Sequence, residues 1–319
     1  MIRKIGVLTS GGDSPGMNAA IRAVTRVALA NGIEVVGIHD GYKGLVEGNF
    51  QPFVKKNVSD IMDRGGTILG SARLPEFKEE AVVSKAVEQL KNNNIDAIVV
   101  IGGDGSYRGA LSLTKHGINC VSLPGTIDND IQGTDFTIGF DTALNTIVDC
   151  VDKLRDTSSS HHRCSVVEVM GNRCGDLAIY SGISTGAEIL ITPETGYDEE
   201  TVLDKLKYLE SLGKNHAIVI VSEKVTDVNA LAVKITENTN FSGRATILGH
   251  IQRGGTPTPN DRVLASRMGE KAVELLINGI GGHCMCIRNN KISSMPIEEA
   301  LSLPRENKKE FYRLFDKLV

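Results

Sequence analysis

Short apolar runs alternate with longer amphipathic segments along most of the chain. The short runs have the length and flanking turn residues of buried strands, and the longer segments repeat apolar residues at helical spacing. The predicted strands cover residues 5–9, 34–38, 98–103, 120–123, 164–169, 188–192, 216–222 and 283–287. The predicted helices cover residues 15–28, 79–92, 141–155, 175–184, 198–212, 227–238 and 261–278, followed by a polar C-terminal helix. This alternation predicts an α/β fold with mainly parallel sheets.

Two neighbouring predicted strands end in small residues and carboxylates. The run IVVIGG opens into Asp104, and the run CVSL opens into a loop that carries Asp128 and Asp130. Loops at the carboxyl ends of parallel strands line the ligand crevice of an open sheet. We therefore expect the three carboxylates to face one cleft and that cleft to be the active site.

A glycine-rich loop follows the first predicted strand. Residues 10–16 read SGGDSPG, with Ser14 as the expected N-cap of the next helix and Pro15 in its first turn. Glycine N–H groups and the positive end of a helix together suit a phosphate. A tight strand-to-helix turn without any ligand explains the same residues equally well, so both interpretations stay open.

Length and composition predict two units of ordinary globular character. The 319 residues exceed the roughly 100–200 that one domain usually holds. We expect a boundary in the glycine- and threonine-containing segment 133–139. The chain is 41% hydrophobic and 23% charged, and no segment approaches the ~20 continuous apolar residues of a membrane helix. The first apolar run is too short for a secretory signal, so we expect a cytoplasmic protein without a membrane partner.

The cysteine pattern and the net charge argue against further classes of protein. The six cysteines are scattered without a CxxC pair, so neither a zinc site nor a disulfide framework is expected. A net charge of −4 argues against a nucleic-acid partner. Arginines concentrate in residues 155–173 and 244–267, which favours small phosphate ligands.

The glycine turn at residues 103–109 is not a standard dinucleotide fingerprint. Its spacing is GxGxxxG, it carries Asp104, and the chain contains no GxxxxGK[ST] motif. An aspartate beside glycine N–H groups is better suited to Mg²⁺ on a nucleotide phosphate.

Other polar motifs permit simpler interpretations. The run at residues 156–162 lacks a GxSxG elbow and is predicted to be a loop. Arg22 and Arg26, four residues apart, are predicted to be solvated. His250 with Arg253 would form a phosphate clamp, although such a pair is more often structural.

Six loops together resemble the bacterial ATP-dependent 6-phosphofructokinases. They are LTSGGDSPGMN (8–18), RGGTILGSAR (64–73), GGDGS (102–106), PGTIDND (124–130), DTSSSHHR (156–163) and LGHIQRGG (248–255). The resemblance implies two similar three-layer αβα domains with mainly parallel sheets, the active site in the cleft between them, and a homotetramer. Residues 1–138 plus 251–301 would form the ATP-binding domain. Residues 139–250 plus 302–319 would bind fructose 6-phosphate.

The resemblance also implies a role for each matching residue. Asp128 would be the general base, with Thr126 and Asp130 beside it, and Asp104 would bind Mg²⁺. ATP would contact Gly12, Arg73, Gly103, Asp104, Gly105 and Ser106. The sugar phosphate would contact Thr126, Asp128, Met170, Gly171, Asn172, Glu223, His250 and Arg253, with Arg163 and Arg244 supplied by a neighbouring subunit.

The phosphoryl donor and the regulation follow from the same resemblance. Gly105 and Gly125 match the ATP-using branch, because pyrophosphate-dependent relatives carry Asp and Lys there. An effector pocket for nucleoside diphosphate or phosphoenolpyruvate would replace the solvated interpretation of the first arginine pair. Its members would be Arg22, Arg26, Lys55, Arg155, Gly186, Glu188, Lys214 and His216.

Two departures from the family pattern affect function. The usual run Met-Gly-Arg is here Met-Gly-Asn, with Asn172 followed by Arg173, and an extended segment would turn that arginine to the opposite face. Leu212 and Asn215 occupy effector positions that are often basic, which predicts weaker allosteric control. The alternatives are an NAD or lipid kinase with a GGDG loop, which would lack PGTIDND, and a non-catalytic sugar-phosphate sensor, which would need no base.

Overall fold

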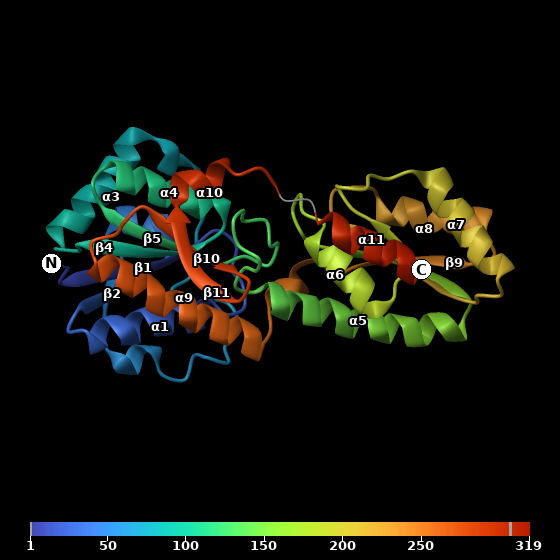
Figure 1. Ribbon diagram of the computed structural model, residues 1–319, viewed down its shortest axis with the longest axis horizontal. Helices are drawn as coiled ribbons and strands as arrows, with labels where there is room; N and C mark the ends of the chain where they lie inside the picture. Colours follow the sequence, from blue (N-terminus) through green and yellow to red (C-terminus); the bar gives the residue numbers. More distant parts are fainter. Residues whose placement is uncertain (1, 306–307) are drawn as a thin grey trace. The chain divides into compact units, whose positions relative to one another are not determined.

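The computed structural model describes residues 2–305 and 308–319, which form two compact units (Figure 1). Unit 1 comprises Met1–Ile127, Ile131–Thr142 and Arg253–Arg305, and unit 2 comprises Asp128–Asp130, Ala143–Gln252 and Glu306–Val319. The division differs from the expected one because Asp128–Asp130 groups with the second unit and because the other boundaries are displaced by two to four residues. Each unit has its own sheet, and the predicted α/β fold is confirmed.

Unit 1 contains a seven-stranded, mostly parallel sheet. In spatial order its strands are β11 (Lys291–Pro296), β10 (His283–Arg288), β5 (Asn119–Pro124), β4 (Ala97–Gly102), β1 (Lys4–Ser10), β2 (Glu34–Ile38) and β3 (Phe50–Phe53). The two edge strands, β3 and β11, are antiparallel to their neighbours. Every residue of β4 is buried, as expected for a parallel strand whose two faces are both covered.

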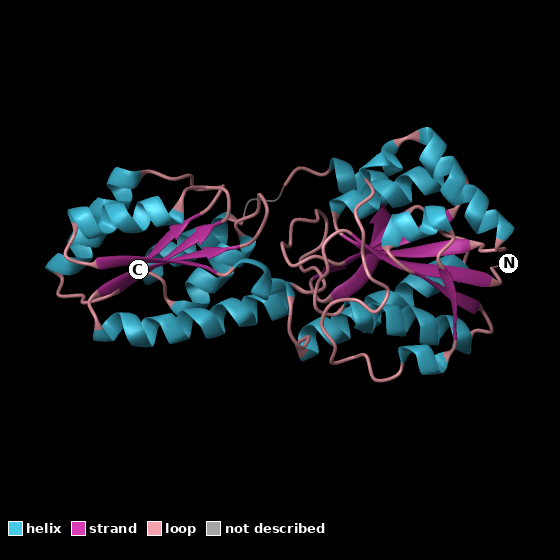
Figure 2. Cartoon of the chain, turned by 180° about the vertical axis from the view of Figure 1, so that it is seen from behind, coloured by secondary structure: helices cyan, strands magenta, loops and turns pink. Residues whose placement is uncertain are grey.

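Helices cover both faces of the unit 1 sheet (Figure 2). Along β4, Val99 and Ile101 pack into the hydrophobic cluster of one face, whereas Ile98 and Val100 pack into the cluster of the other. The first face carries α1 (Met17–Ala30) and α9 (Pro259–Ile277). The second carries α2 (Gly41–Glu47), α3 (Glu80–Asn92), α4 (Asp104–Lys115) and α10 (Ile297–Ser302). Two 3₁₀ helices, η1 (Lys55–Val58) and η2 (Pro75–Lys78), lie in the connections.

Unit 2 contains a four-stranded, fully parallel sheet. In spatial order its strands are β7 (Ile189–Ile191), β8 (Ala217–Ser222), β6 (Arg163–Val169) and β9 (Ser242–Ile247). Its helices are α5 (Phe140–Ser160), α6 (Asp176–Thr185), α7 (Glu199–Ser211), α8 (Val228–Asn238), η3 (Gly249–Arg253) and α11 (Lys309–Leu318).

Crossover handedness explains the layers of unit 2. The connection from β6 to β7 runs one way along the sheet, and the connections from β7 to β8 and from β8 to β9 run the other way. Right-handed crossovers then place α6 on one face and α7 with α8 on the opposite face. The side chains of α7 and α8 accordingly share one hydrophobic cluster.

Three local predictions were wrong. Helix α5 continues through Asp156 to Ser160, so the predicted polar loop is mostly helical, and the Ser158 hydroxyl lies 2.7 Å from that of buried Ser165. Helix α1 begins at Met17 after Gly16, and Ser14 does not cap it because its hydroxyl donates to the Ile138 carbonyl. The apolar-run criterion also missed the mixed-polarity strands β3, β9 and β11.

A buried carboxylate fixes the start of α5 to α9. Asp261 is 1% exposed and accepts hydrogen bonds from the Gly139 and Thr142 amides, both at 2.8 Å, and from the Thr142 hydroxyl at 2.6 Å. We expect Asp261→Ala to lower the free energy of unfolding by about 2–4 kcal/mol, because it leaves buried donors without an acceptor. Equilibrium unfolding in denaturant measures this free energy, and Asn260→Ala, at an exposed neighbouring position, is the control. The same free energy of unfolding in both variants would contradict the expectation.

Candidate functional site

Three strand ends in unit 1 meet in register. Ser10 at the end of β1 pairs with Gly102 at the end of β4, and Gly102 pairs with Pro124 at the end of β5. The loops that follow carry Gly11 and Gly12, Gly103–Ser106, and Gly125 with Thr126. The parallel register therefore brings most of the predicted nucleotide residues to one edge of one sheet.

The chain also changes direction at this edge. From β1 it proceeds through α1 to β2 on one side, whereas from β4 it proceeds through α4 to β5 on the other side. Helices α1 and α4 therefore lie on opposite faces, and the loops after β1 and β4 diverge. Such a switch point opens a crevice at the carboxyl ends of the strands, where α/β proteins bind ligands.

An arginine lies against the first glycine loop. A Cβ atom built on Gly12 would lie 2.1 Å from Nη1 of Arg253, so only glycine lets the guanidinium approach this backbone. The Nε atom of Arg253 is buried and has no hydrogen-bond partner among the described residues. A guanidinium beside glycine N–H groups is suited to a phosphate, which supports the phosphate interpretation of this loop.

Helix α4 presents one carboxylate at its first turn. Asp104 is the first residue of α4, and its side chain is 51% exposed and pairs with Arg108 at 3.0 Å. Such a surface pair is worth only about 0.3–0.5 kcal/mol, so a bound cation can displace it. One carboxylate beside phosphate oxygens is a donor set that suits Mg²⁺. No group of three or more metal-ligating side chains occurs among the residues that the structure describes.

Hydrogen bonds fix the neighbouring loops. The Ser106 hydroxyl donates to the Ser10 carbonyl at 3.0 Å, and the Ser71 hydroxyl donates to the Gly11 carbonyl at 2.6 Å. The second bond holds the segment that carries Arg73, whose side chain is exposed. The glycine loop thus has fixed partners on both sides.

Five predicted sugar-phosphate residues of unit 2 lie on the segments that follow β6, β8 and β9, namely Met170, Gly171, Asn172, Glu223 and His250. The Asn172 amide donates to Oε1 of Glu223 at 2.7 Å, and the Glu223 amide donates to the Val169 carbonyl at 2.8 Å. These bonds connect the loop of Met170 and Gly171 to the loop after β8. His250 is exposed in η3, which follows β9.

Asp130 lies close to the same loops. Nδ2 of Asn172 donates to Oδ2 of Asp130 at 3.4 Å, and Nζ of Lys224 donates to Oδ1 of Asn172 at 2.9 Å. Burial raises the pKa of the Glu168 carboxyl, and the charges of Glu223 and Asp227 raise it further. This end of the unit 2 sheet is therefore rich in carboxylates, with Lys224 as a nearby cation that sequence reasoning missed.

The segment around Asn172 is a turn. The Cys174 amide donates to the Gly171 carbonyl at 2.7 Å, and Asn172 has a φ of 59°. The alternation of an extended segment therefore does not apply, and the expected inversion of Arg173 has no basis. A buried glutamine was also missed: Oε1 of Gln252 accepts from the Met170 amide at 3.1 Å. Its place inside the LGHIQRGG motif was the available signal.

Arg163 and Arg244 are not brought to these loops. Arg163 begins β6, and six residue steps of about 3.3 Å put its backbone roughly 20 Å from the other end of that strand. Arg244 lies within the edge strand β9, paired with Ser165 in the middle of β6. Both side chains therefore belong to another part of the unit 2 surface.

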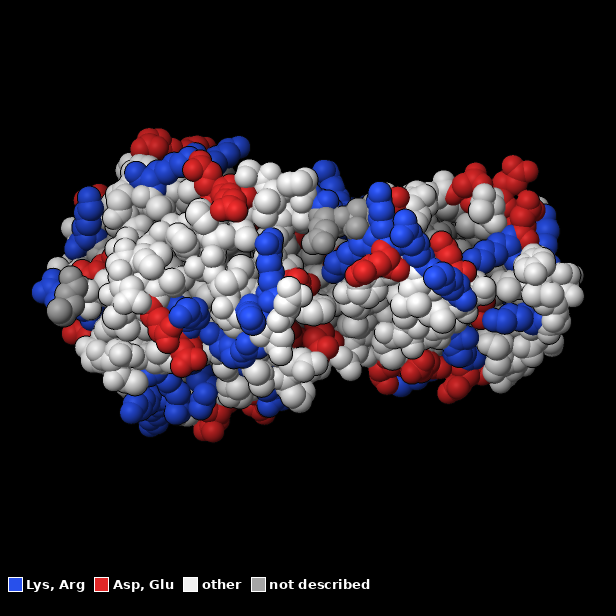
Figure 3. All heavy atoms as spheres, in the orientation of Figure 1, with Lys and Arg blue, Asp and Glu red and all other residues white. Residues whose placement is uncertain are grey.

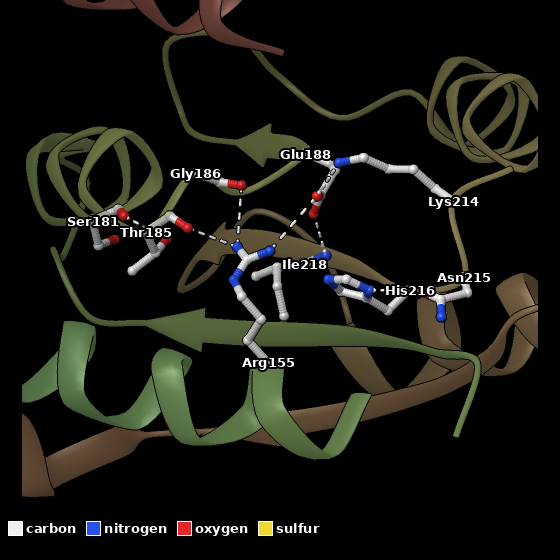
Figure 4. Close-up of polar contacts among 9 residues, drawn as sticks. All are labelled: Arg155, Ser181, Thr185, Gly186, Glu188, Lys214, Asn215, His216 and Ile218. Carbon is white, nitrogen blue, oxygen red and sulfur yellow. Dashed lines mark hydrogen bonds and ion pairs between the residues drawn. The ribbon is translucent and has the colours of Figure 1, made fainter. Parts of the chain in front are cut away.

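The predicted effector residues of unit 2 cluster at the opposite end of its sheet (Figure 4). Glu188 is 2% exposed, and its Oε1 lies 2.6 Å from Nζ of Lys214 and 3.7 Å from Nη1 of Arg155. Nη2 of Arg155 donates to the Gly186 carbonyl at 3.1 Å. Burial lowers the pKa of His216, and although Glu188 opposes this shift, the cations Arg155 and Lys214 lower the pKa further.

The remaining predicted effector residues lie in unit 1. Nη2 of Arg26 donates to the Ser59 hydroxyl at 3.4 Å, and that hydroxyl donates to the Lys55 carbonyl at 3.0 Å. Arg22 and Arg26 are both partly exposed. Nε of Arg26 is buried without a hydrogen-bond partner among the described residues.

The visible face of the surface mixes charges of both signs (Figure 3). Lys and Arg side chains are interspersed with Asp and Glu over the visible face (Figure 3). Among the residues that the structure describes, no helix is long and apolar enough to span a bilayer.

In both sheets, loops at the carboxyl ends of parallel strands carry predicted ligand-binding residues. This is the arrangement of an α/β enzyme that acts on phosphorylated small molecules. The comparisons with known proteins identify the family. A family model described as phosphofructokinase matches residues 4–276, and the chain belongs to the phosphofructokinase family. The predicted membership is thus confirmed.

The chain is similar to curated relatives and to a solved structure over nearly its whole length. An ATP-dependent 6-phosphofructokinase of Aliivibrio fischeri strain MJ11 is 56% identical over 319 residues, covering 100% of both chains. One from Teredinibacter turnerae is 58% identical over 301 residues, covering 94% of both. A phosphofructokinase structure from Saccharomyces cerevisiae has a TM-score of 0.88 at 35% identity; the match covers 99% of this chain and 47% of that one. The chain thus spans about half the length of the yeast chain.

Proposed function

We propose that this chain transfers the γ-phosphoryl group of Mg-ATP to the 1-hydroxyl of D-fructose 6-phosphate, giving fructose 1,6-bisphosphate and ADP in the committed step of glycolysis. The observation that carries the proposal is 56% identity over all 319 residues to a relative named ATP-dependent 6-phosphofructokinase. The loop geometry of both units is compatible with that reaction.

ATP would bind the loops of unit 1. Gly12 and the loop from Gly103 to Ser106 offer N–H groups to the phosphates, and Arg73 offers a positive charge. Mg²⁺, when bound through Asp104, would neutralise charge on the phosphates. Phosphoryl transfer requires the protein mainly to align the reactants and to neutralise charge, and these groups would do both.

The sugar phosphate would bind the loops of unit 2. Asp128 would accept the proton of the 1-hydroxyl, with Thr126 and Asp130 beside it to orient the substrate. Met170, Gly171, Asn172, Glu223 and His250 would contact the sugar and its phosphate, and Arg253, which belongs to unit 1, would contact the phosphate as well. The hydrogen bonds between Asn172, Glu223 and Asp130 support a common role for these loops.

The direct test is ADP release from the purified chain. We expect release that requires both fructose 6-phosphate and Mg-ATP, with fructose 1,6-bisphosphate as product and no turnover when pyrophosphate replaces ATP. Chelation of Mg²⁺ should abolish the reaction. Tight binding of fructose 6-phosphate without ADP release would instead indicate a non-catalytic sensor.

The position of Asn172 predicts a gain of activity. We expect the double substitution Asn172→Arg with Arg173→Asn to raise kcat by up to about tenfold, equivalent to ~1.4 kcal/mol of transition-state stabilisation. Residue 172 faces Asp130 and Glu223, so a guanidinium there would add positive charge where phosphate charge is handled. Steady-state kinetics measure the effect. Unchanged turnover would show that Arg173 already reaches the site or that the charge is unimportant.

Arg163 and Arg244 would act on a neighbouring subunit of a homotetramer. Their distance from the other unit 2 site residues supports this assignment. The edge strand β9 carries Arg244 together with Ile247, which is 55% exposed, and so offers a surface for a second copy. A monomer in solution with full activity would contradict the assignment.

The effector cluster would bind ADP or phosphoenolpyruvate weakly. Glu188 engages both Lys214 and Arg155, which leaves little free positive charge, and Leu212 is 63% exposed where a cation is common. We expect a fructose 6-phosphate saturation curve with a Hill coefficient of about 1, changed little by either effector. A strongly sigmoidal curve with phosphoenolpyruvate that ADP relieves would contradict this expectation.

A further inference from the structure

We propose that Lys308 and Asp176 are positioning residues that hold Asn129, and thereby orient the carboxylates of Asp128 and Asp130. The inference deepens the function proposed above and rests on it. Three contacts within unit 2 carry it: one to the Asn129 side chain, one to its carbonyl, and one ion pair behind them.

Asn129 has an unusual backbone conformation. It is 7% exposed and has a φ of 53°, in the left-handed region that most side chains avoid. Asparagine adopts this region more readily than most residues, and the contacts described below hold Asn129 in it. Since Asn129 lies directly between Asp128 and Asp130, its conformation sets the directions in which both carboxylates point.

Asp176 holds the Asn129 side chain. Nδ2 of Asn129 donates to Oδ2 of Asp176 at 2.8 Å, while the Asn129 carbonyl accepts from Sγ of Cys174 at 3.9 Å. Asp176 is the first residue of α6, where the helix dipole favours a carboxylate. The turn is thus held at both its side chain and its main chain by the segment that begins α6.

Lys308 neutralises the carboxylate that makes this contact. Its Nζ lies 2.6 Å from Oδ2 of Asp176, the same oxygen that Asn129 uses, and the two side chains are only 20% and 11% exposed. A buried carboxylate without a partner is costly and gains a proton or water instead. Burial lowers the pKa of Lys308, but the charge and hydrogen bond of Asp176 together with Tyr180 raise it, so the net shift is upward and favours the ammonium form.

Lys308 and Asp176 lie far apart in the sequence, and the packing of two helices brings them together. Lys308 precedes α11, which packs along α6, the helix that begins with Asp176. The Lys308 ammonium also lies 4.9 Å from the ring centroid of Tyr180 on α6. The C-terminal segment therefore has a defined route by which it affects the loop of the proposed base.

The test compares three variants of the full-length chain, once the wild type has shown ADP release. We expect Lys308→Met to lower kcat by about 10- to 100-fold, since small misplacement of a reacting group has effects of that size, with both KM values within about threefold. Lys308→Arg should recover most of the loss because it restores the charge. Lys309→Met, at the exposed neighbouring position, is the matched control and should keep wild-type kcat.

Two further variants separate positioning from stability. The double variant Asp176→Asn with Lys308→Met removes both charges but keeps an acceptor for Asn129, so its kcat should exceed that of Lys308→Met alone. Asn129→Gly keeps a positive φ without strain and leaves the ion pair intact, so kcat should fall while the melting temperature hardly changes. Wild-type kcat in Asn129→Gly would overturn the proposal even if Lys308→Met failed to fold. Equal kcat in Lys308→Met and Lys309→Met would also overturn it. A wild type without kinase activity would instead refute the proposed function.

Discussion

Asp128→Asn should lower kcat by about 10²- to 10⁴-fold, the contribution expected of one positioned general base. The substitution keeps the shape of the side chain but removes the group that accepts the proton of the sugar hydroxyl. Because the remaining loops still bind and align both substrates, the two KM values should change far less than kcat. Steady-state ADP release with saturating fructose 6-phosphate and Mg-ATP measures the loss.

The control is a carboxylate outside both loop clusters. Asp149 lies on α5 with its side chain 65% exposed, so Asp149→Asn should retain wild-type kinetics. Circular dichroism and melting temperature should match in both variants and the wild type. Activity of Asp128→Asn within about threefold of the wild type would exclude Asp128 as a general base, because a positioned base is worth far more.

The sequence predicts the buried strands well because their signal is local. Strands such as β4 and β8 are buried at every residue, so a continuous apolar run marks each of them. Two of the four residues of β3, Gln51 and Pro52, are exposed, and β9 is half polar, so neither strand has such a run. Both lie at sheet edges, where pairing with a neighbour, rather than apolar content, decides the structure.

The candidate site is predictable in its residue types but not in its alignment. Glycines and aspartates after strands indicate a crevice, yet the register that aligns Ser10, Gly102 and Pro124 depends on long-range pairing. The contact of Arg253 with Gly12 joins residues that lie far apart in the sequence. Asp176 and Lys308 have no motif in the sequence, since their relation to Asn129 arises only from the packing of α11 on α6.

Gly105→Asp should reduce kcat/KM for ATP by about 10²-fold, because two negative charges ~5 Å apart at an effective dielectric constant of ~20 repel by about 3 kcal/mol. Gly105 lies in the first turn of α4, directly after Asp104, where we propose that nucleotide phosphates bind. A Cβ atom at this position meets no atom within 4 Å, and the residue has no positive φ. The new carboxylate therefore enters open space without disturbing the fold.

This geometry makes the result interpretable, because the charge and the volume of the new side chain can be separated. Gly105→Ala adds the Cβ atom without the charge and should keep kcat/KM for ATP within about threefold, since the space is open and a single alanine in a first helical turn is well tolerated. Equal losses in both variants would mean that the backbone at this position, rather than the charge, governs ATP use. A fall in melting temperature of Gly105→Asp would contradict the open space seen around Gly105. A loss of kcat/KM for ATP in Gly105→Asp but not in Gly105→Ala would indicate that the phosphates bind at the first turn of α4.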